Sequence, residues 1–225
     1  MDREQYQAKM AQLKKLVLIG FIASVIVALI AIVMLGLYNI NGILTIHTGN
    51  EGSKYYDPFT YPGWQSLFGF AGPMIIQGYE ENTVDVFMII AIILPILAGL
   101  ICTIMLATNF KRKGTNVKKA VLEFIMCALL VFAAIAVLNI KNVWIANASK
   151  VPGGSYADYY NDYLLPAIAG KDGGYFKVEA YPIILGIVCL LAALVKGCNG
   201  ALLIYQKNFA KKNAPKKDSV QVTDK

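Results

Sequence analysis

Two ionisable residues, Glu123 and Lys196, stand inside long apolar stretches that run over residues 120–138 and 181–205. A charged side chain is costly in hydrocarbon, roughly 2.5 to 3.5 kcal/mol for a lysine at the centre of a membrane-spanning helix. If both stretches cross a membrane as antiparallel helices, the two residues differ in depth by about 5 Å, which the lysine stem can cover. The sequence therefore predicts an ion pair between Glu123 and Lys196.

A second interpretation of these two residues stays open. Lys196 can instead extend its ammonium group toward the cytoplasmic surface while Glu123 reaches cytoplasmic water, so that the two never meet. If they do meet, the chemistry that such a pair could support is the passage of ions or protons.

The remaining reactive side chains give little support for catalysis. The single histidine, His47, has no companion for a metal site or a proton relay, and the four cysteines lack the C-x-x-C spacing of metal ligands. These cysteines, Cys102, Cys127, Cys189 and Cys198, all fall within apolar stretches. No phosphate-binding loop, nucleophile elbow or zinc-protease motif is present. We expect no enzyme activity, no cofactor and no metal.

Composition predicts an integral membrane protein. Hydrophobic residues make up 57% of the 225 residues and charged residues 16%, whereas soluble domains are about 45 to 50% apolar. Four uninterrupted apolar runs are each close to the ~20 residues that a helix needs to cross the hydrocarbon. They cover residues 16–38, 84–108, 120–138 and 181–205. The predicted fold is an all-α bundle of four transmembrane helices.

Lysine and arginine residues predict the orientation of this bundle. Segments 1–15, 109–119 and 206–225 together carry fifteen of them, whereas the long connections 39–83 and 139–180 carry five. Because positive residues favour the cytoplasmic side, both termini are expected inside and the long connections outside. Segment 206–225 is expected to be a disordered cytoplasmic tail. The basic excess is interpreted as a topology signal, with no nucleic-acid partner.

Neither long connection contains a cysteine, so no external disulfide can form. Long loops of animal cell-surface proteins are usually joined by disulfides. Their absence favours a bacterial cytoplasmic membrane as the location.

Each long connection begins with a segment of strand-like composition. Residues 41–49 and 141–149 hold Ile, Leu, Thr, Val and Trp in short runs that end in Gly, Asn or Ser. Because unpaired strands expose backbone groups, we expect these segments to pair in a small external sheet. A sparse match between residues 39–46 and 139–146 also suggests an internal repeat of two hairpins. The alternative is that any two such hairpins need similar junction residues.

Aromatic residues in the long connections predict an interfacial patch. Trp64, Leu67 and Phe68 lie at helical spacing on one side of a turn, and four tyrosines form a similar stripe in the second connection. The candidate patch comprises Trp64, Leu67, Phe68, Tyr156, Tyr159, Tyr160 and Tyr163. Because Trp and Tyr rings favour headgroup depth, we expect short interfacial helices on the bilayer or on the span ends. A patch that docks a partner is the alternative.

Small residues in the fourth span predict close helix packing. Gly197, Gly200 and Ala201 would let a neighbouring backbone approach.

The layout of four spans, inner termini and a strand-bearing first outer connection resembles that of tetraspan proteins such as claudins. The stretch "PGWQSLFG" at residues 62–69 is similar to the W-G-L-W signature of that family. The paired loop cysteines of claudins are absent here, so the resemblance implies topology alone.

Two function classes follow. The first is a non-catalytic multi-pass protein that organises contacts with protein partners, lipid or envelope through its outer connections, with a membrane protein or a second copy of itself as partner. The second is a small oligomeric transporter or channel. The scarcity of charge within the spans favours the first.

Overall fold

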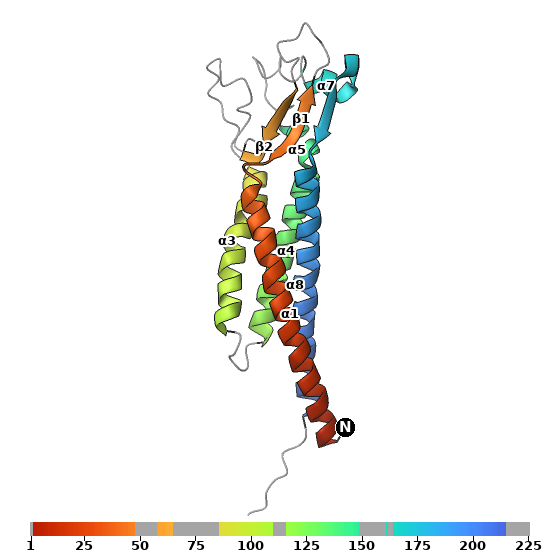
Figure 1. The fold of residues 1–225 in the computed structure, drawn as a ribbon. Coiled ribbons are helices and arrows are strands. Elements are labelled where there is room, and N and C mark those ends of the chain that lie inside the picture. The colour runs from red at the N-terminus through yellow and green to blue at the C-terminus, as the bar shows by residue number, and fades with distance from the viewer. Residues whose placement is uncertain are drawn as a thin grey trace, which may run out of the picture.

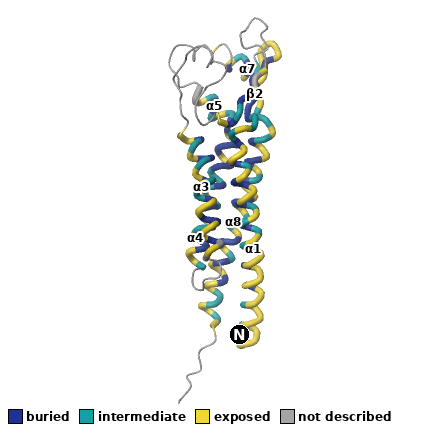
Figure 2. Tube along the Cα trace, turned by 60° about the vertical axis from the view of Figure 1, so that its left-hand side comes forward, coloured by how far each residue is buried: buried dark blue, intermediate teal, exposed yellow. Residues whose placement is uncertain are grey.

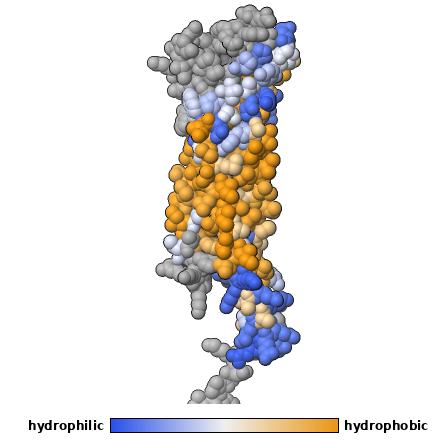
Figure 3. Space-filling model, in the orientation of Figure 1, coloured by the Kyte–Doolittle hydropathy of each residue, from blue (hydrophilic) through white to orange (hydrophobic). Residues whose placement is uncertain are grey.

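The computed structural model describes residues 2–47, 58–64, 86–109, 116–148, 161 and 164–214. Four of its helices are long and apolar enough to cross a membrane, which indicates a membrane protein. They are α1 (Arg3–Leu37), α3 (Val86–Asn109), α4 (Asn116–Leu138) and α8 (Ala180–Asn213). They stand side by side (Figure 1), and an apolar band covers the face of the bundle that Figure 3 shows. These helices correspond to the four predicted spans.

Each long helix packs against two others. α8 lies between α1 and α4, and α3 contacts α4 and α1. Buried residues face the inside of this ring and exposed ones face outward (Figure 2). In α8 they recur at alternating steps of four and three, the spacing of helices packed as in coiled coils. The series is Leu185, Cys189, Ala192, Lys196, Asn199, Leu203 and Gln206. The buried face of α8 therefore carries three polar side chains, Lys196, Asn199 and Gln206.

α1 and α8 continue together past the apolar band at the end of the bundle where α1 begins, here called the termini end (Figures 1 and 3). Tyr6 stacks on Phe209 with ring centroids 6.0 Å apart. Lys9 Nζ lies 5.7 Å from the centre of the same ring. Residues 206–213 are thus helical, which corrects the expectation of disorder from residue 206; residues 215–225 lie outside the described part.

A three-stranded sheet covers the opposite end of the bundle, here called the sheet end (Figure 1). The central strand β1 (Gly42–His47) pairs antiparallel with β2 (Phe59–Pro62) and with β3 (Tyr175–Val178). β1 and β2 follow α1, whereas β3 precedes α8. The two long connections are therefore joined by one sheet.

The predicted partner of the first strand segment was wrong. Residues 140–148 form a helix, α5 (Ile140–Ala148), directly after α4. Its apolar residues Ile140 and Trp144 stand four apart, so one helical turn buries both beneath the sheet. This burial outweighs the strand-like composition of the segment. The two segments matched in the suggested repeat thus differ in secondary structure, and the fold lends that repeat no support.

Short elements complete the second connection. α7 (Leu165–Ala169) ends at Gly170, whose φ of 65° is left-handed and suits a residue without a Cβ atom. The 3₁₀ turn η3 (Lys171–Gly173) follows and leads into β3.

Gly63 is a site where the sheet end tolerates no side chain. A Cβ atom added there would overlap the carbonyl oxygen of Tyr38 at the end of α1, whereas one added at Gly36 meets nothing within 4 Å. We therefore expect Gly63→Ala to lower the melting temperature in mild detergent by several degrees and to speed proteolysis of the sheet end. Gly36→Ala, which supplies a better helix former, should leave both unchanged or slightly improved. Equal behaviour of the two variants would contradict this packing.

Candidate functional site in the bundle core

The structure brings Glu123 and Lys196 together in the core. Lys196 Nζ lies 3.0 Å from Glu123 Oε2, and both side chains are fully buried. The contact joins α4 to α8, and Glu123 is about 10 Å from the first residue of α4 at the termini end. In the structure, Lys196 therefore pairs with Glu123 and does not extend to the surface.

Two neutral side chains complete the surroundings of the Glu123 carboxylate. Ser24 Oγ lies 2.8 Å from each carboxylate oxygen, so its single proton is shared between them or donated to one. Asn199 Nδ2 donates to Glu123 Oε1 at 2.8 Å. Hydrogen bonds to a charged acceptor are stronger than neutral ones. The carboxylate is thus held from α1 and α8 together.

The helix α3 adds two more buried residues at a similar depth. A Cβ atom added at Gly99 would lie 3.0 Å from Met126 of α4, which places Thr103, one turn further along α3, within about one turn of the depth of Glu123. Cys102 and Thr103 are both buried. All four helices thus contribute to one layer, here called the polar layer, which consists of Ser24, Thr103, Glu123, Lys196 and Asn199.

Gly20 lets α1 approach the polar layer. A Cβ atom there would lie 2.6 Å from Asn199 Oδ1, so any larger residue must displace the amide. The close approach holds Asn199 with its Nδ2 toward Glu123.

Ser24, Asn199 and Thr103 were not predicted from the sequence. Serine, threonine and asparagine carry no charge, so hydropathy alone does not single them out. A usable signal is present, because Asn199 follows Lys196 by three residues and Ser24 follows Gly20 by four, which are steps along one helix face.

The surroundings of the polar layer differ on its two sides. Toward the termini end, Val17, Ala120 and Leu203 form a small apolar cluster. Beyond it, Asn116 Nδ2 donates to Gln206 Oε1 at 2.9 Å. Toward the sheet end, the core is a long apolar cluster that includes Met126, Leu130 and Cys189.

The predicted packing residues divide between two surroundings. Gly200 faces Phe124 of α4, whose ring atoms would lie 3.1 Å from an added Cβ. Gly197 and Ala201 instead line an open apolar groove between α4 and α8, together with Cys127 and Cys198. Gly200 is thus packed tightly against α4, and a Cβ atom added at Gly197 would lie 3.5 Å from Cys127 Sγ of the same helix.

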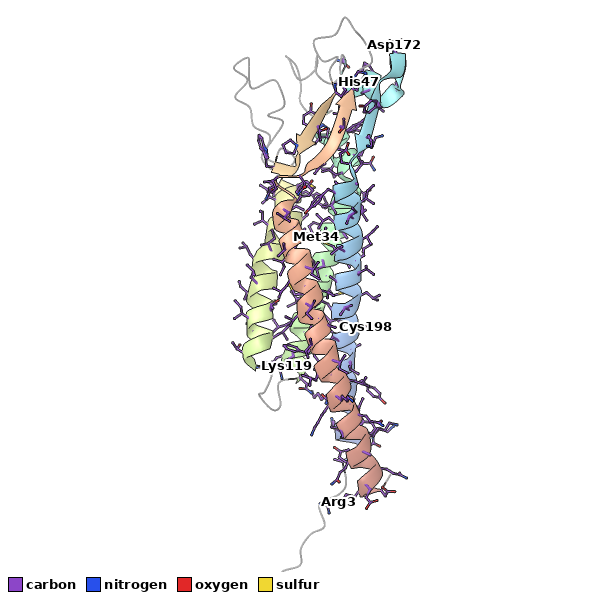
Figure 4. The ribbon with its side chains drawn as sticks, in the orientation of Figure 1. Arg3, Met34, His47, Lys119, Asp172 and Cys198 are labelled. Atoms are coloured by element: carbon purple, nitrogen blue, oxygen red, sulfur yellow. The ribbon has the colours of Figure 1, made fainter. Side chains whose placement is uncertain are left out.

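The candidate interfacial patch is described at one residue. Trp64 is 38% exposed, and its backbone N–H donates to Asn39 O at 3.2 Å, which fixes it at the end of α1. The other members, Leu67, Phe68, Tyr156, Tyr159, Tyr160 and Tyr163, lie outside the described residues. His47 lies in the sheet (Figure 4), with its ring 5.4 Å from that of Tyr175.

Within the described residues, no three His, Cys, Asp or Glu side chains gather as metal ligands would. All four cysteines are free thiols.

A scan against known protein families, a search of curated proteins and a search of solved structures each found no match to this chain. The function of the chain must therefore be inferred from the geometry of its structure.

Breaking the buried pair should cost far more than breaking a surface pair. Glu123→Gln or Lys196→Met leaves one buried charge without its counter-charge, and each should lower the free energy of unfolding by about 3 to 5 kcal/mol. The double variant should regain much of this loss. Stability is measured by denaturant titration of the detergent-solubilised protein.

Lys177→Met supplies the matched control for this measurement. Lys177 Nζ lies 3.6 Å from Glu179 Oε2 at the surface, with the lysine side chain 64% exposed. Its loss should cost at most about 1 kcal/mol. If Lys196→Met were as mild as Lys177→Met, the buried charge pair would not stabilise the bundle.

Proposed function

We propose that this chain is a non-catalytic four-span protein of a cell membrane that presents its sheet end on the outer side to a membrane-protein partner. Both termini lie in the cytoplasm, as the fifteen-to-five division of basic residues favours. The bilayer contacts the apolar band, and the buried Glu123–Lys196 ion pair serves the assembly of the bundle.

The observation that carries this proposal is the single sheet made from two connections. β1 lies between β2, from the same connection, and β3, from the other. A loop that served only to join two helices would not need this pairing. Built as one unit, the two connections can present a fixed surface to a partner.

Side chains beneath the sheet make this unit rigid. The Trp144 ring, 2% exposed, lies 4.8 Å from the Tyr61 ring and joins α5 to β2. Lys141 Nζ donates to Phe176 O at 3.2 Å and lies 5.1 Å from the Phe176 ring centre, which joins α5 to β3. The unit is thus anchored to α4 through α5.

Polar side chains also cross the sheet. Thr45 Oγ1 of β1 lies 2.7 Å from Thr60 Oγ1 of β2. It donates to Glu179 Oε1, just beyond β3, at 2.6 Å. The backbone N–H of Glu179 donates to Ile43 O at 2.9 Å. These contacts fix the register of all three strands before any partner binds.

The orientation can be tested with two introduced cysteines. Lys177→Cys in β3 should react with an impermeant thiol reagent on intact cells, whereas Ala214→Cys at the end of α8 should react only after the cells are opened. Both positions are exposed in the structure, so access differs only by side. Labelling of Ala214→Cys on intact cells would refute the orientation.

The partner proposal can be tested with a photo-crosslinking amino acid at Trp64. We expect a discrete adduct with one membrane protein, which mass spectrometry identifies and which re-forms with that protein after purification. The adduct should disappear in Gly63→Ala, which disturbs the sheet end. Leu194, 63% exposed on the apolar band, is the control position and should give no such adduct. The same amino acid placed at Tyr175 gives a second test position. If neither Trp64 nor Tyr175 gave an adduct, the proposal would be contradicted.

A small oligomeric transporter or channel is the second candidate, and the buried Glu123–Lys196 pair is the observation that favours it. Ion or proton flux in proteoliposomes that Lys196→Met abolishes, while the protein stays folded, would favour this function over the first.

A further inference from the structure

Three polar atoms of the polar layer have no hydrogen-bond partner in the described part of the chain. They are Lys196 Nζ, Asn199 Oδ1 and Thr103 Oγ1. Lys196 Nζ lies 3.0 Å from Glu123 Oε2, but this ion pair leaves the remaining N–H groups of the ammonium without an acceptor among the described residues. All three side chains are at least nine-tenths buried, at 0%, 3% and 9% exposure.

Unpaired buried donors and acceptors are expensive, and more so where hydrocarbon surrounds the helices. A water molecule is the ligand that such groups most often take, with about three hydrogen bonds to otherwise unpaired atoms. Lys196 can only donate, Asn199 Oδ1 can only accept, and the Thr103 hydroxyl can do both. Water, which both donates and accepts, complements all three.

We propose that the polar layer is an internal water-binding site, and that its water exchanges with the aqueous phase at the termini end of the bundle only. Water there accepts from the Lys196 ammonium and donates to Thr103 Oγ1 or Asn199 Oδ1. It also reaches the Cys102 thiol, which is buried in α3 next to Thr103.

The one-sided exchange follows from what lies above and below the layer. Toward the termini end the barrier is the small cluster of Val17, Ala120 and Leu203. This cluster is flanked by Lys119, which is buried and lies near that end of α4 (Figure 4), and by the Asn116–Gln206 pair. Glu123 is about 10 Å from that end of α4 and about 22 Å from Leu138 at the other. The longer path passes only through the apolar core.

Two native cysteines provide a matched test in the unmodified protein. Both cysteines belong to the apolar core cluster, Cys102 where it borders the polar layer and Cys189 farther toward the sheet end, and they are 6% and 0% exposed. Silver ion, which is small and needs water to travel, is applied to one side of sealed proteoliposomes for increasing times. Alkylation after unfolding and peptide mass spectrometry then give the blocked fraction of each cysteine separately.

We expect Cys102 to be blocked about tenfold faster than Cys189, a ratio that corresponds to ~1.4 kcal/mol in the free energy of access. The faster reaction should occur from the side at which Ala214→Cys reacts, and not from the side at which Lys177→Cys reacts. Equal rates for the two cysteines, or faster blocking of Cys102 from the Lys177 side, would overturn the proposal.

A second pair of variants tests the path itself. Leu203→Ala removes side-chain atoms from the apolar cluster between the layer and the termini end. Leu130→Ala removes the same atoms from the apolar core on the sheet side of the layer. Both leucines are buried. Leu203→Ala should speed the blocking of Cys102 severalfold from the termini side, and Leu130→Ala should not. The opposite order would show that water enters from the sheet end. Neither Leu is part of the polar layer, so its ion pair stays intact.

Discussion

A carboxylate buried among four apolar helices must find its whole solvation shell inside the protein, and Glu123 sets this constraint. Lys196 supplies the counter-charge, and Ser24 and Asn199 supply hydrogen bonds at 2.8 Å. These partners come from α8 and α1, so the Glu123 contacts hold only when three helices stand at one depth. A shift of either neighbour by one helical turn, about 5.4 Å, would separate these atoms beyond hydrogen-bonding distance. Buried polar groups can fix helix register in this way even when an apolar core would be more stable.

The two ends of the bundle are held together by different kinds of contact. At the termini end, α1 and α8 leave the apolar band as helices joined by ring contacts of Tyr6 and Phe209. At the sheet end, backbone pairing of β1 with strands from both connections replaces side-chain contacts between helices. Tyr181 Oη of α8 also donates to Met34 O near the end of α1. Helix register set in the core therefore reaches the sheet, because β1 follows α1 and β3 leads into α8.

Much of this fold could be predicted from sequence because hydrocarbon imposes length and composition on the spans. Counting residues along the two spans likewise placed Glu123 and Lys196 at similar depths. β1 was predicted from its β-branched residues, but Ile140 and Trp144 fit a strand and a helix equally well in isolation, and only burial beneath the sheet decides. β3 holds four residues, Tyr175–Val178, too few to show a period. Asn199 and Ser24 follow Lys196 and Gly20 at helical steps, but Thr103 could not be selected without knowing which helix faces meet.

The geometry of the polar layer also bears on what the bundle can do. The Glu123 carboxylate receives three partners from the protein, so it is not presented to a passing ion, whereas Lys196 still has protons to donate. A transport pathway would need the ion pair to open toward both aqueous phases in turn. The long apolar core between Glu123 and the sheet end opposes that step. The same core transmits a fixed helix register to the sheet. A bundle built in this way is better suited to holding the sheet end in place than to alternating between two openings.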